Sequence, residues 1–539
     1  MAFLQPAEEP RTGSSRVSPG SAGWGCGQAA DIRDLFRDRR VPAKPLWWFH
    51  PKVLWASRND RIAHWITDPT DYERGRWVRA RLAAGVDPEL TVGAYAEEDQ
   101  VSFLVLGDTG EGDSSQYHVV RPMLARSEGI SFTYLVSDII YPAGDVLDYE
   151  DKLFRPYQRL PGPIYAVPGN HDWYDGLHGF MTLLCDADPD LRPPADQELS
   201  RWRRWLLAVL WRRVSSRKRQ EQLQRMRDVR EGLRPARSEQ PAPYFSIELK
   251  ELLLVGIDTG IRGELDAEQG QWLRKVSAAP KDKILVTGKP LVVNARRKDI
   301  RIDGIPETVR DIVDDPAHRY IATIGGDTHN YQRYPVVHDD GRVLQHLVTG
   351  AGGAYTKATH IIPRATVEEC GCDEADFRCY PLRGDSLATY SILFDRRFGF
   401  RRGRFVVPRQ QAPAVMAERL GGGLEPTRET DRGATVSPKA RRAARVVHPL
   451  SARTGPLYRF FSEFLDWDTP DPPLFKSFLR IDVRPGELEI KCCSATGCAE
   501  HESDPPLEDH VRGTRTGEGR WSWREFPPAE VRPTGETSR

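Results

Sequence analysis

The sequence lacks both a long apolar run and an excess of charge of either sign. No stretch approaches the roughly 18 apolar residues of a spanning helix, and no basic segment followed by an apolar one stands at the N-terminus. Lysine plus arginine number 77, as do aspartate plus glutamate, so overall charge does not favour nucleic acid or a membrane as partner. We therefore expect a soluble, cytoplasmic protein. No specific nucleic-acid motif is present, and nothing predicts an oligomeric state.

Cysteine is also sparse, with eight residues in a chain of 539. Six of the eight fall late, in two groups: Cys370, Cys372 and Cys379, then Cys492, Cys493 and Cys498. A cytosolic chain seldom needs disulfides, and neither group has the paired spacing of a zinc ribbon. Buried thiols are the favoured interpretation, and a structural zinc site is the alternative.

Composition divides the chain into segments. The first 30 residues and residues 411–444 are rich in small, polar or charged residues and proline, which favours disorder or a flexible linker. Tryptophan is frequent in residues 31–99, where helix-like segments precede the first predicted strand. The expected organisation is a disordered N-terminus (1–30), a helical aromatic-rich extension (31–99), an α/β domain (100–410), a flexible linker (411–444), a β-hairpin segment (445–503) and a loose tail (504–539).

An insertion at residues 200–235 is strongly basic and carries Trp and Leu at helical spacing. One interpretation is a helical lid that packs its apolar face on the domain. The other is peripheral contact of residues 201–235 with a membrane surface or a polyanion, because Trp and Leu opposite a cationic face suit a lipid interface. The lid is favoured, and both remain open.

Polar residues follow three predicted strands at the point where each strand ends. Asp108 comes after residues 101–106, Asp138 and Tyr141 follow the next strand, and the third strand runs into GNHD. Functional groups in open α/β sheets gather at the carboxyl ends of strands, where turns expose side chains into one crevice. The sequence thus predicts one site built from three strand ends.

The ordered motifs GDTG, SDIIY, GNHD and GDTH resemble the calcineurin-like metallophosphoesterases, most of all their purple-acid-phosphatase-like branch. The resemblance covers about residues 100–410. It implies a four-layer α/β/β/α sandwich, here with a helical N-terminal extension and an inserted helical lid. It also implies hydrolysis of a phosphomonoester or phosphodiester by a hydroxide bound to two metal ions.

The resemblance also assigns roles by position. Asp138 would bridge two ions, with Asp108, Tyr141 and His329 completing the first metal site and Asn170 in the second. His171 would stabilise the transition state or protonate the leaving oxygen, and we expect Asp172 to orient it. The cofactors would be two divalent ions, or iron with a divalent partner, drawn from Mn, Fe, Zn and Mg.

The chain departs from the family pattern at three places. Gly110 stands where most of the wider family has a histidine, which would leave room for Tyr141. Gly288 replaces a histidine ligand and Asp327 replaces another, so the second metal site is expected to be weak or remodelled. Lys289 could neutralise phosphate there, and a solvated lysine is equally plausible. The alternative to an enzyme is a weakly active or inactive relative that serves as a binding or regulatory protein, possibly at a membrane surface.

Overall fold

The structure is a computed structural model, and it describes most of the chain. The described residues are 24, 26–36, 50–65, 68–191, 202, 205, 211, 216–233, 240–399, 402–422, 435–447, 472–517 and 519–526.

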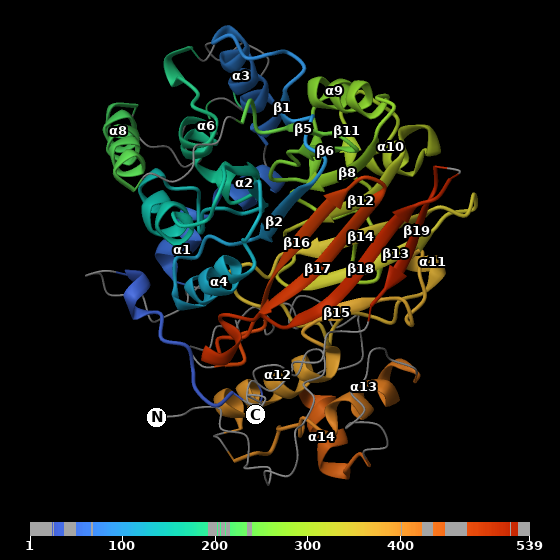
Figure 1. The fold of residues 1–539 in the computed structure, drawn as a ribbon. Helices are drawn as coiled ribbons and strands as arrows, with labels where there is room; N and C mark the ends of the chain where they lie inside the picture. The colour runs from blue at the N-terminus through green and yellow to red at the C-terminus, as the bar shows by residue number, and fades with distance from the viewer. Residues whose placement is uncertain are drawn as a thin grey trace, which may run out of the picture.

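Two β-sheets lie face to face at the centre of the molecule (Figure 1). The first has eight strands in the order β1 (Thr91–Tyr95), β5 (Phe245–Leu249), β6 (Leu252–Ile257), β8 (Asp282–Thr287), β12 (Tyr320–Gly325), β14 (Val343–Thr349), β13 (Tyr331–Val337) and β15 (Arg378–Tyr380). The second has seven, in the order β19 (Trp521–Glu525), β18 (Leu507–Arg515), β17 (Glu487–Ala495), β16 (Lys476–Arg484), β2 (Val101–Gly107), β3 (Phe132–Val136) and β4 (Ile164–Val167).

Helices pack on the outer faces of the sheets, and the helices after β15 lie at one end of the sandwich (Figure 1). The helices are α1 (Pro51–Ala56), α2 (Asn59–Trp65), α3 (Thr70–Ala83), α4 (Ser114–Ala125), α5 (Arg155–Tyr157), α6 (His178–Leu183), α8 (Ser216–Leu233), α9 (Ala267–Ser277), α10 (Val309–Asp314), α11 (Val367–Cys370), α12 (Arg383–Phe398), α13 (Ala412–Leu420) and α14 (Pro438–Val447). Two short pairs, β7 (Glu264–Leu265) with β11 (Arg301–Ile302) and β9 (Val292–Val293) with β10 (Arg296–Arg297), lie beside them.

Three apolar cores join these layers. One lies between the sheets and includes Phe103 and Phe245, a second joins β2–β4 to α4, α6 and α8, and a third joins β6 and β8 to α9 and α10. Strands such as β2 and β3 are buried along their whole length because both faces are covered. The predicted four-layer α/β/β/α sandwich is confirmed.

The segment 31–99 is helical as expected, but it also contributes a strand. Strand β1 pairs in parallel with β5 at the edge of the eight-stranded sheet. Helix α3 is anchored by Trp77, whose indole N–H donates to the carbonyl of Gly176 over 2.9 Å. Trp55 and Trp65 are exposed, and residues 37–49 lie outside the described part of the chain. The extension is therefore part of the sandwich rather than an appendage.

Two stretches that composition marked as irregular contain regular elements. Helices α13 and α14 lie within or across the end of the expected linker 411–444, of which residues 423–434 are outside the described range. Ala440, Ala443, Ala444 and Val447 of α14 are buried, at helical spacing. Strands β18 and β19 lie in the expected loose tail and extend the second sheet. Their many charged residues reflect an edge position with one face towards solvent.

The predicted hairpin around Pro485 and Gly486 is present, and it is central. Strands β16 and β17 pair antiparallel across this turn, and β16 also pairs with β2. In Figure 1 the red C-terminal strands thus lie beside the blue strand β2. The C-terminal segment completes the sheet that carries the three motif strands.

The basic insertion forms α8, which packs on the domain. Leu223 and Met226 are buried in the core shared with α6, so the apolar face of α8 is covered by protein. This is the arrangement of the lid interpretation. Trp202 and Trp205 are exposed, most of residues 201–215 lie outside the described range, and membrane contact stays a prediction. No helix among the described residues is long and apolar enough to cross a membrane.

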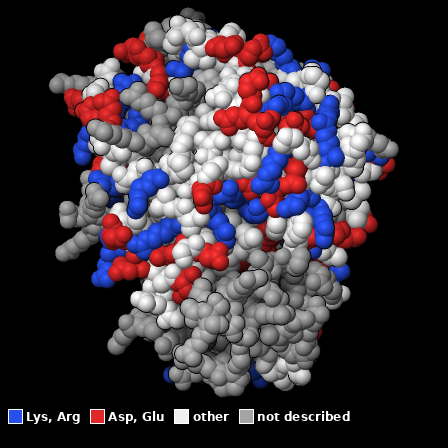
Figure 2. Space-filling view, viewed as in Figure 1, with Lys and Arg blue, Asp and Glu red and all other residues white. Residues whose placement is uncertain are grey.

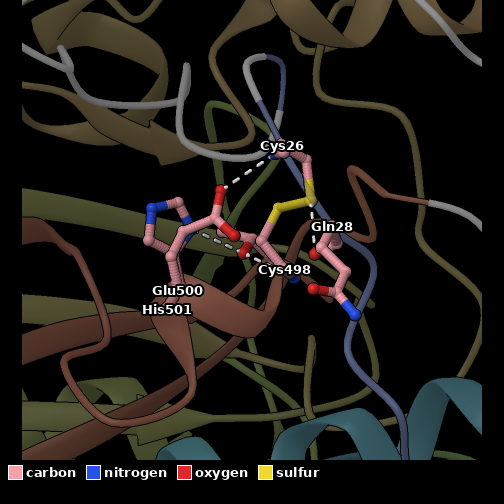
Figure 3. The surroundings of a disulfide bond; sticks show 7 residues. Cys26, Gln28, Cys498, Glu500 and His501 are labelled. Atoms are coloured by element: carbon pink, nitrogen blue, oxygen red, sulfur yellow. Dashed lines mark hydrogen bonds between the residues drawn. A yellow bond between two sulfur atoms is a disulfide. The ribbon is translucent and has the colours of Figure 1, made fainter.

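The cysteines differ from the expectation in one respect. Cys26 and Cys498 form a disulfide, and the other six are buried thiols (Figure 3). The remaining late cysteines do not gather into a three-ligand cluster within the described chain; the closest pair, Cys370 and Cys372, has its sulfurs 3.9 Å apart. Residues 1–23 of the predicted disordered N-terminus lie outside the described range, whereas Ala29 pairs with Cys498.

Candidate metal centre

The motif residues converge at the carboxyl ends of strands from both sheets. Asp108 follows β2, Asp138 and Tyr141 follow β3, Asn170 and His171 follow β4, and Asp327 and His329 follow β12. Asp108, Ser137 and Asp327 have φ of +50°, +63° and +63°. Left-handed backbone is unfavourable for residues other than glycine, and such strain clusters at functional sites. The left-handed backbone at these three strand ends turns the chain so that the motif side chains face one site.

The phenol oxygen of Tyr141 lies at the centre of the cluster. It is 3.0 Å from Asp138 Oδ2, 3.2 Å from Asp108 Oδ1 and 3.0 Å from His329 Nε2. The ligand atoms of Asp108, Asp138 and His329 all lie within 4.8 Å of one another, and all three residues are buried. The structure thus brings together the four residues expected to form the first metal site.

The protons available in this cluster do not satisfy its acceptors. His329 donates its Nδ1–H to the carbonyl of Tyr355 over 2.9 Å, so Nε2 of the neutral ring is an acceptor. Tyr141 has one proton for three acceptors, and Asp108 Oδ2 is buried without a hydrogen bond. Buried acceptors without donors are costly. A cation held by these atoms would remove that cost, so the donor set fits a metal ion.

The electrostatics of the cluster point the same way. Burial, together with the carboxylates of Asp138 and Asp327, raises the pKa of Asp108 well above its usual value. Burial also lowers the pKa of His329 far enough to keep the imidazole neutral, the form that binds metals. Burial and the carboxylates of Asp138 and Asp108 raise the pKa of Tyr141. A bound cation would reverse the repulsion that causes these shifts.

The second metal site is sparser. Asn170 donates its amide N–H to the hydroxyl of Tyr174 over 2.8 Å, which leaves its carbonyl oxygen as the potential ligand. The Asp327 carboxylate is half-buried and makes no hydrogen bond within the described part of the chain. It lies close enough to Asp108 to raise the pKa of that residue, yet outside its compact cluster. Asn170 and Asp327 thus follow strand ends that meet at the first site, but they make fewer contacts with other potential ligands than its residues do.

Backbone closes two positions where the family pattern has histidines. A Cβ added at Gly110 would lie 1.7 Å from the carbonyl oxygen of Ile139. A Cβ at Gly288 would lie 2.9 Å from the carbonyl oxygen of Pro168 and from Thr259 Oγ1. These spaces are filled by neighbouring chain, so neither position accepts an imidazole without rearrangement.

The expected contact between His171 and Asp172 is wrong. His171 donates Nδ1–H to the carbonyl of Pro142 over 2.7 Å, and its ring lies 4.6 Å from that of Tyr141. Its backbone N–H donates to Asp138 Oδ1 over 2.8 Å. His171 is thus at the cluster, but a backbone carbonyl rather than a carboxylate orients its ring.

Asp172 instead holds the loop that carries Asp138. Its carboxylate accepts hydrogen bonds from the backbone N–H groups of Ile139, Ile140 and Gly169 over 2.9–3.2 Å. Burial and the charge of Asp138 raise its pKa to about 8, against the effect of these N–H groups. The sequence thus predicted that Asp172 lies beside the site, but it did not predict that backbone N–H groups would be its hydrogen-bond donors.

Two lysines need to be distinguished near these strand ends. Lys289, the predicted phosphate-binding residue, is half-buried and donates to the carbonyl of Ile261 over 2.8 Å. Lys357, which no motif indicated, donates to the carbonyl of Asp327 over 2.8 Å. After burial, its charge is the next cause that lowers the pKa of His329, and it opposes the burial that raises the pKa of Asp108. Lys357 lies in the loop after β14, and the pairing of β14 with β12 and β13 brings that loop to the site.

Comparison with known families adds an independent observation. The family model described as calcineurin-like phosphoesterase matches residues 101–210, which contain the GDTG, SDIIY and GNHD motifs. The match covers residues 101–210 of 539, a part of the chain that includes β2, β3 and β4 and thus the strand ends that hold Asp108, Asp138 and Asn170.

Similar solved structures are distant from this chain. They include PhoD (10% identity, 82% of this chain and 74% of that chain, TM-score 0.37) and the purple acid phosphatase PPD1 from yellow lupin, Lupinus luteus (11%, 79% and 55%, 0.35). Another is GAP50 of Plasmodium, an anchor in the inner membrane complex (11%, 52% and 77%, 0.30). The chain thus spans little more than half of the lupin enzyme. At these TM-scores the likenesses add nothing to the family assignment, and no curated protein matches the sequence.

Proposed function

We propose that this chain is a metal-dependent hydrolase of phosphate esters, with its site at Asp108, Asp138, Tyr141 and His329. The observation that carries the proposal is the shortage of protons in the cluster: three acceptors surround the single proton of Tyr141, and Asp108 Oδ2 has no donor. Metal ions bound there would polarise a phosphoryl oxygen and lower the pKa of a water molecule.

The residues of the chain have separate tasks in this proposal. Asp108, Asp138 and His329 bind the first ion, with Tyr141 as a phenolic ligand, while Asn170 and Asp327 contribute to a weaker second site. The carbonyl of Pro142 accepts from Nδ1–H of His171, so the ring would have to be protonated at both nitrogens for its Nε2–H to give a proton to the leaving oxygen. Asp172 keeps the Asp138 loop in place through three backbone N–H groups.

A second candidate function is a binding or regulatory role with little or no catalysis. The closed positions Gly110 and Gly288 favour it, because two imidazoles of the family pattern have no space here. Such a protein would hold one ion at the compact cluster and bind phosphate without turnover. Metal stoichiometry and turnover separate the two functions.

The test combines elemental analysis with turnover of p-nitrophenyl phosphate and bis-p-nitrophenyl phosphate in added Mn²⁺. Asp138→Asn should lower metal content and abolish turnover, since it removes a charge from the centre of the cluster. Asp99→Asn is the control, because Asp99 forms an exposed pair with Lys250. Turnover that survives Asp138→Asn would contradict the proposed site. Bound metal without turnover under any ion would favour the binding protein.

A further inference from the structure

The Lys357 ammonium is an unneutralised charge beside the acidic cluster. The residue is half-buried, and its Nζ makes one hydrogen bond, to the carbonyl of Asp327. No carboxylate lies within ion-pair distance of it in the described part of the chain. A lysine ammonium has three N–H donors, so this one bond leaves two of them for a ligand.

The loop that carries Lys357 is fixed on the site by its backbone. The Lys357 N–H donates to the carbonyl of His329 over 2.9 Å, and the carbonyl of Tyr355 accepts from the His329 ring. At the start of the loop, a Cβ at Gly350 would lie 2.7 Å from Asp108 Oδ2. The ammonium is therefore held beside two residues of the proposed first site by a loop with little freedom to move.

We propose that Lys357 binds the phosphoryl group of the substrate and that the substrate is a phosphomonoester dianion. This inference rests on the proposed function. Because Gly288 is closed to a histidine, the second metal site has one ligand fewer than the family pattern, and the ammonium bonded to the Asp327 carbonyl supplies positive charge beside another residue of that site. A monoester dianion carries one more negative charge than a diester, so it gains more from an ammonium and its charge-assisted hydrogen bonds.

The test measures binding of inorganic phosphate to the full-length, Mn²⁺-loaded protein by calorimetry, with metal content determined on the same samples. Lys357→Gln should weaken phosphate binding about ten- to a hundredfold, the loss expected for a charge-assisted hydrogen bond, and leave metal content unchanged. Lys357→Arg, which keeps the charge, should recover part of the affinity. The kcat/KM for p-nitrophenyl phosphate should fall more than that for the bis-p-nitrophenyl diester.

Lys283→Gln is the control. Lys283 also donates its hydrogen bonds to backbone carbonyls, and it lies at the start of β8 rather than at the strand ends that carry the site. Equal weakening in the two variants, unchanged binding in Lys357→Gln, or wild type that does not bind phosphate would each overturn the role of Lys357. A parallel fall in metal content would also overturn it, because Lys357 would then act by supporting Asp327.

Failure of the inference and failure of the proposed function give different results. If wild type binds metal and turns over both substrates, but Lys357→Gln binds phosphate normally, only the role of Lys357 is lost. If wild type has no turnover, yet loses phosphate binding in Lys357→Gln, Lys357 is an anion-binding residue of a protein that is not an enzyme. Equal losses of kcat/KM for the two esters would overturn the monoester assignment alone.

Discussion

At the scale of single residues, the space around glycine decides which ligands the site can have. Gly110 and Gly288 replace histidines of the family pattern, and neighbouring backbone has closed both positions. Tyr141 lies against Gly110 and donates its backbone N–H to the Gly110 carbonyl over 2.9 Å. The loss of one imidazole and the gain of a phenol are thus parts of one local arrangement.

We predict that Gly110→Ala destabilises the protein by at least about 1–3 kcal/mol, the usual cost of overpacking. The added Cβ would meet the carbonyl oxygen of Ile139 at 1.7 Å, and relief of that clash must move the strand end that carries Asp138. Urea denaturation should give a lower midpoint, and elemental analysis should show less bound metal.

Gly93→Ala is the control for this prediction. A Cβ at Gly93 meets no atom within 4 Å, and the residue lies exposed on β1, so the unfolding free energy should change by no more than about 0.5 kcal/mol. Similar losses in the two variants would mean that the closed space at Gly110 is not what the site depends on.

The sequence predicted the residues of the first metal site because each stands at a strand end inside a motif. Asp108, Asp138, Tyr141 and His329 do converge on one point. It did not predict Lys357, because a lysine in a loop after a strand has no distinguishing neighbours. Nor did it predict that a backbone carbonyl would orient His171, since any residue can supply a carbonyl.

At the scale of elements, helix α3 is joined to the sandwich by a buried ionic network. Arg74 is fully buried and lies 2.8 Å from Asp258, at the end of β6, and 2.5 Å from Asp266, which caps α9. Asp258 also accepts from the Trp173 indole beside GNHD over 3.0 Å. The extension therefore supports the strand ends around the metal centre.

Arg74→Met should cost about 3–5 kcal/mol of unfolding free energy, because it leaves buried carboxylates without a counter-charge. Arg79→Met is the matched control on the same helix: Arg79 forms an exposed pair with Glu268 of α9, and its loss should cost less than about 1 kcal/mol. Chemical denaturation at neutral pH measures both. Equal costs would show that α3 is held by its apolar contacts alone.

Strand β17 gives a prediction about pH. Burial raises the pKa of Glu489, but hydrogen bonds from Arg512, Lys491 and His510 outweigh it and lower the pKa from 4.5 to about 2. A carboxyl with a lowered folded pKa stabilises the protein above its unfolded pKa, and this contribution is lost as pH falls towards the folded value. Wild type should have a higher unfolding free energy than Glu489→Gln. This difference should be constant above about pH 5.5 and should decrease from there to pH 3.

Denaturation curves at several pH values measure this difference. Glu128→Gln, at an exposed position, is the control and should follow wild type throughout. A difference between wild type and Glu489→Gln that stays constant down to pH 3 would mean that Glu489 titrates alike in the folded and unfolded chain.

Helices and strands were predicted correctly where the sequence has a clear local pattern of apolar or turn residues. They were missed where a segment was judged by its average composition alone. The motif strands and the Pro485–Gly486 hairpin are local patterns, and they are present. Helix α14 was missed although Ala440, Ala443, Ala444 and Val447 lie at helical spacing, because proline and glycine nearby dominated the composition. The pairing of β16 with β2 joins residues almost 380 positions apart, and no local pattern contains it.

At the scale of the whole molecule, charges of both signs are interspersed over the face in Figure 2, as the equal counts of acidic and basic residues suggest. The two ends of the described chain are joined more specifically. Cys26 and Cys498 form a disulfide across 472 residues of sequence (Figure 3). Ala29 also pairs with Cys498. Arg121 of α4 adds contacts to Asp34 and Glu502. The N-terminal segment is thus fastened to the sheet of the motif strands.

This disulfide leads to a prediction about stability. Disulfides persist in oxidising compartments, so the test uses protein that has folded in one. Denatured, unreduced protein should show six thiols, the eight cysteines less the bonded pair. Because the bond closes a very long loop, reduction or Cys26→Ser should lower the unfolding free energy by about 2–4 kcal/mol. Reductant should have no further effect on Cys26→Ser. Eight thiols in protein from an oxidising compartment would show that backbone pairing and Arg121 hold this segment without the bond.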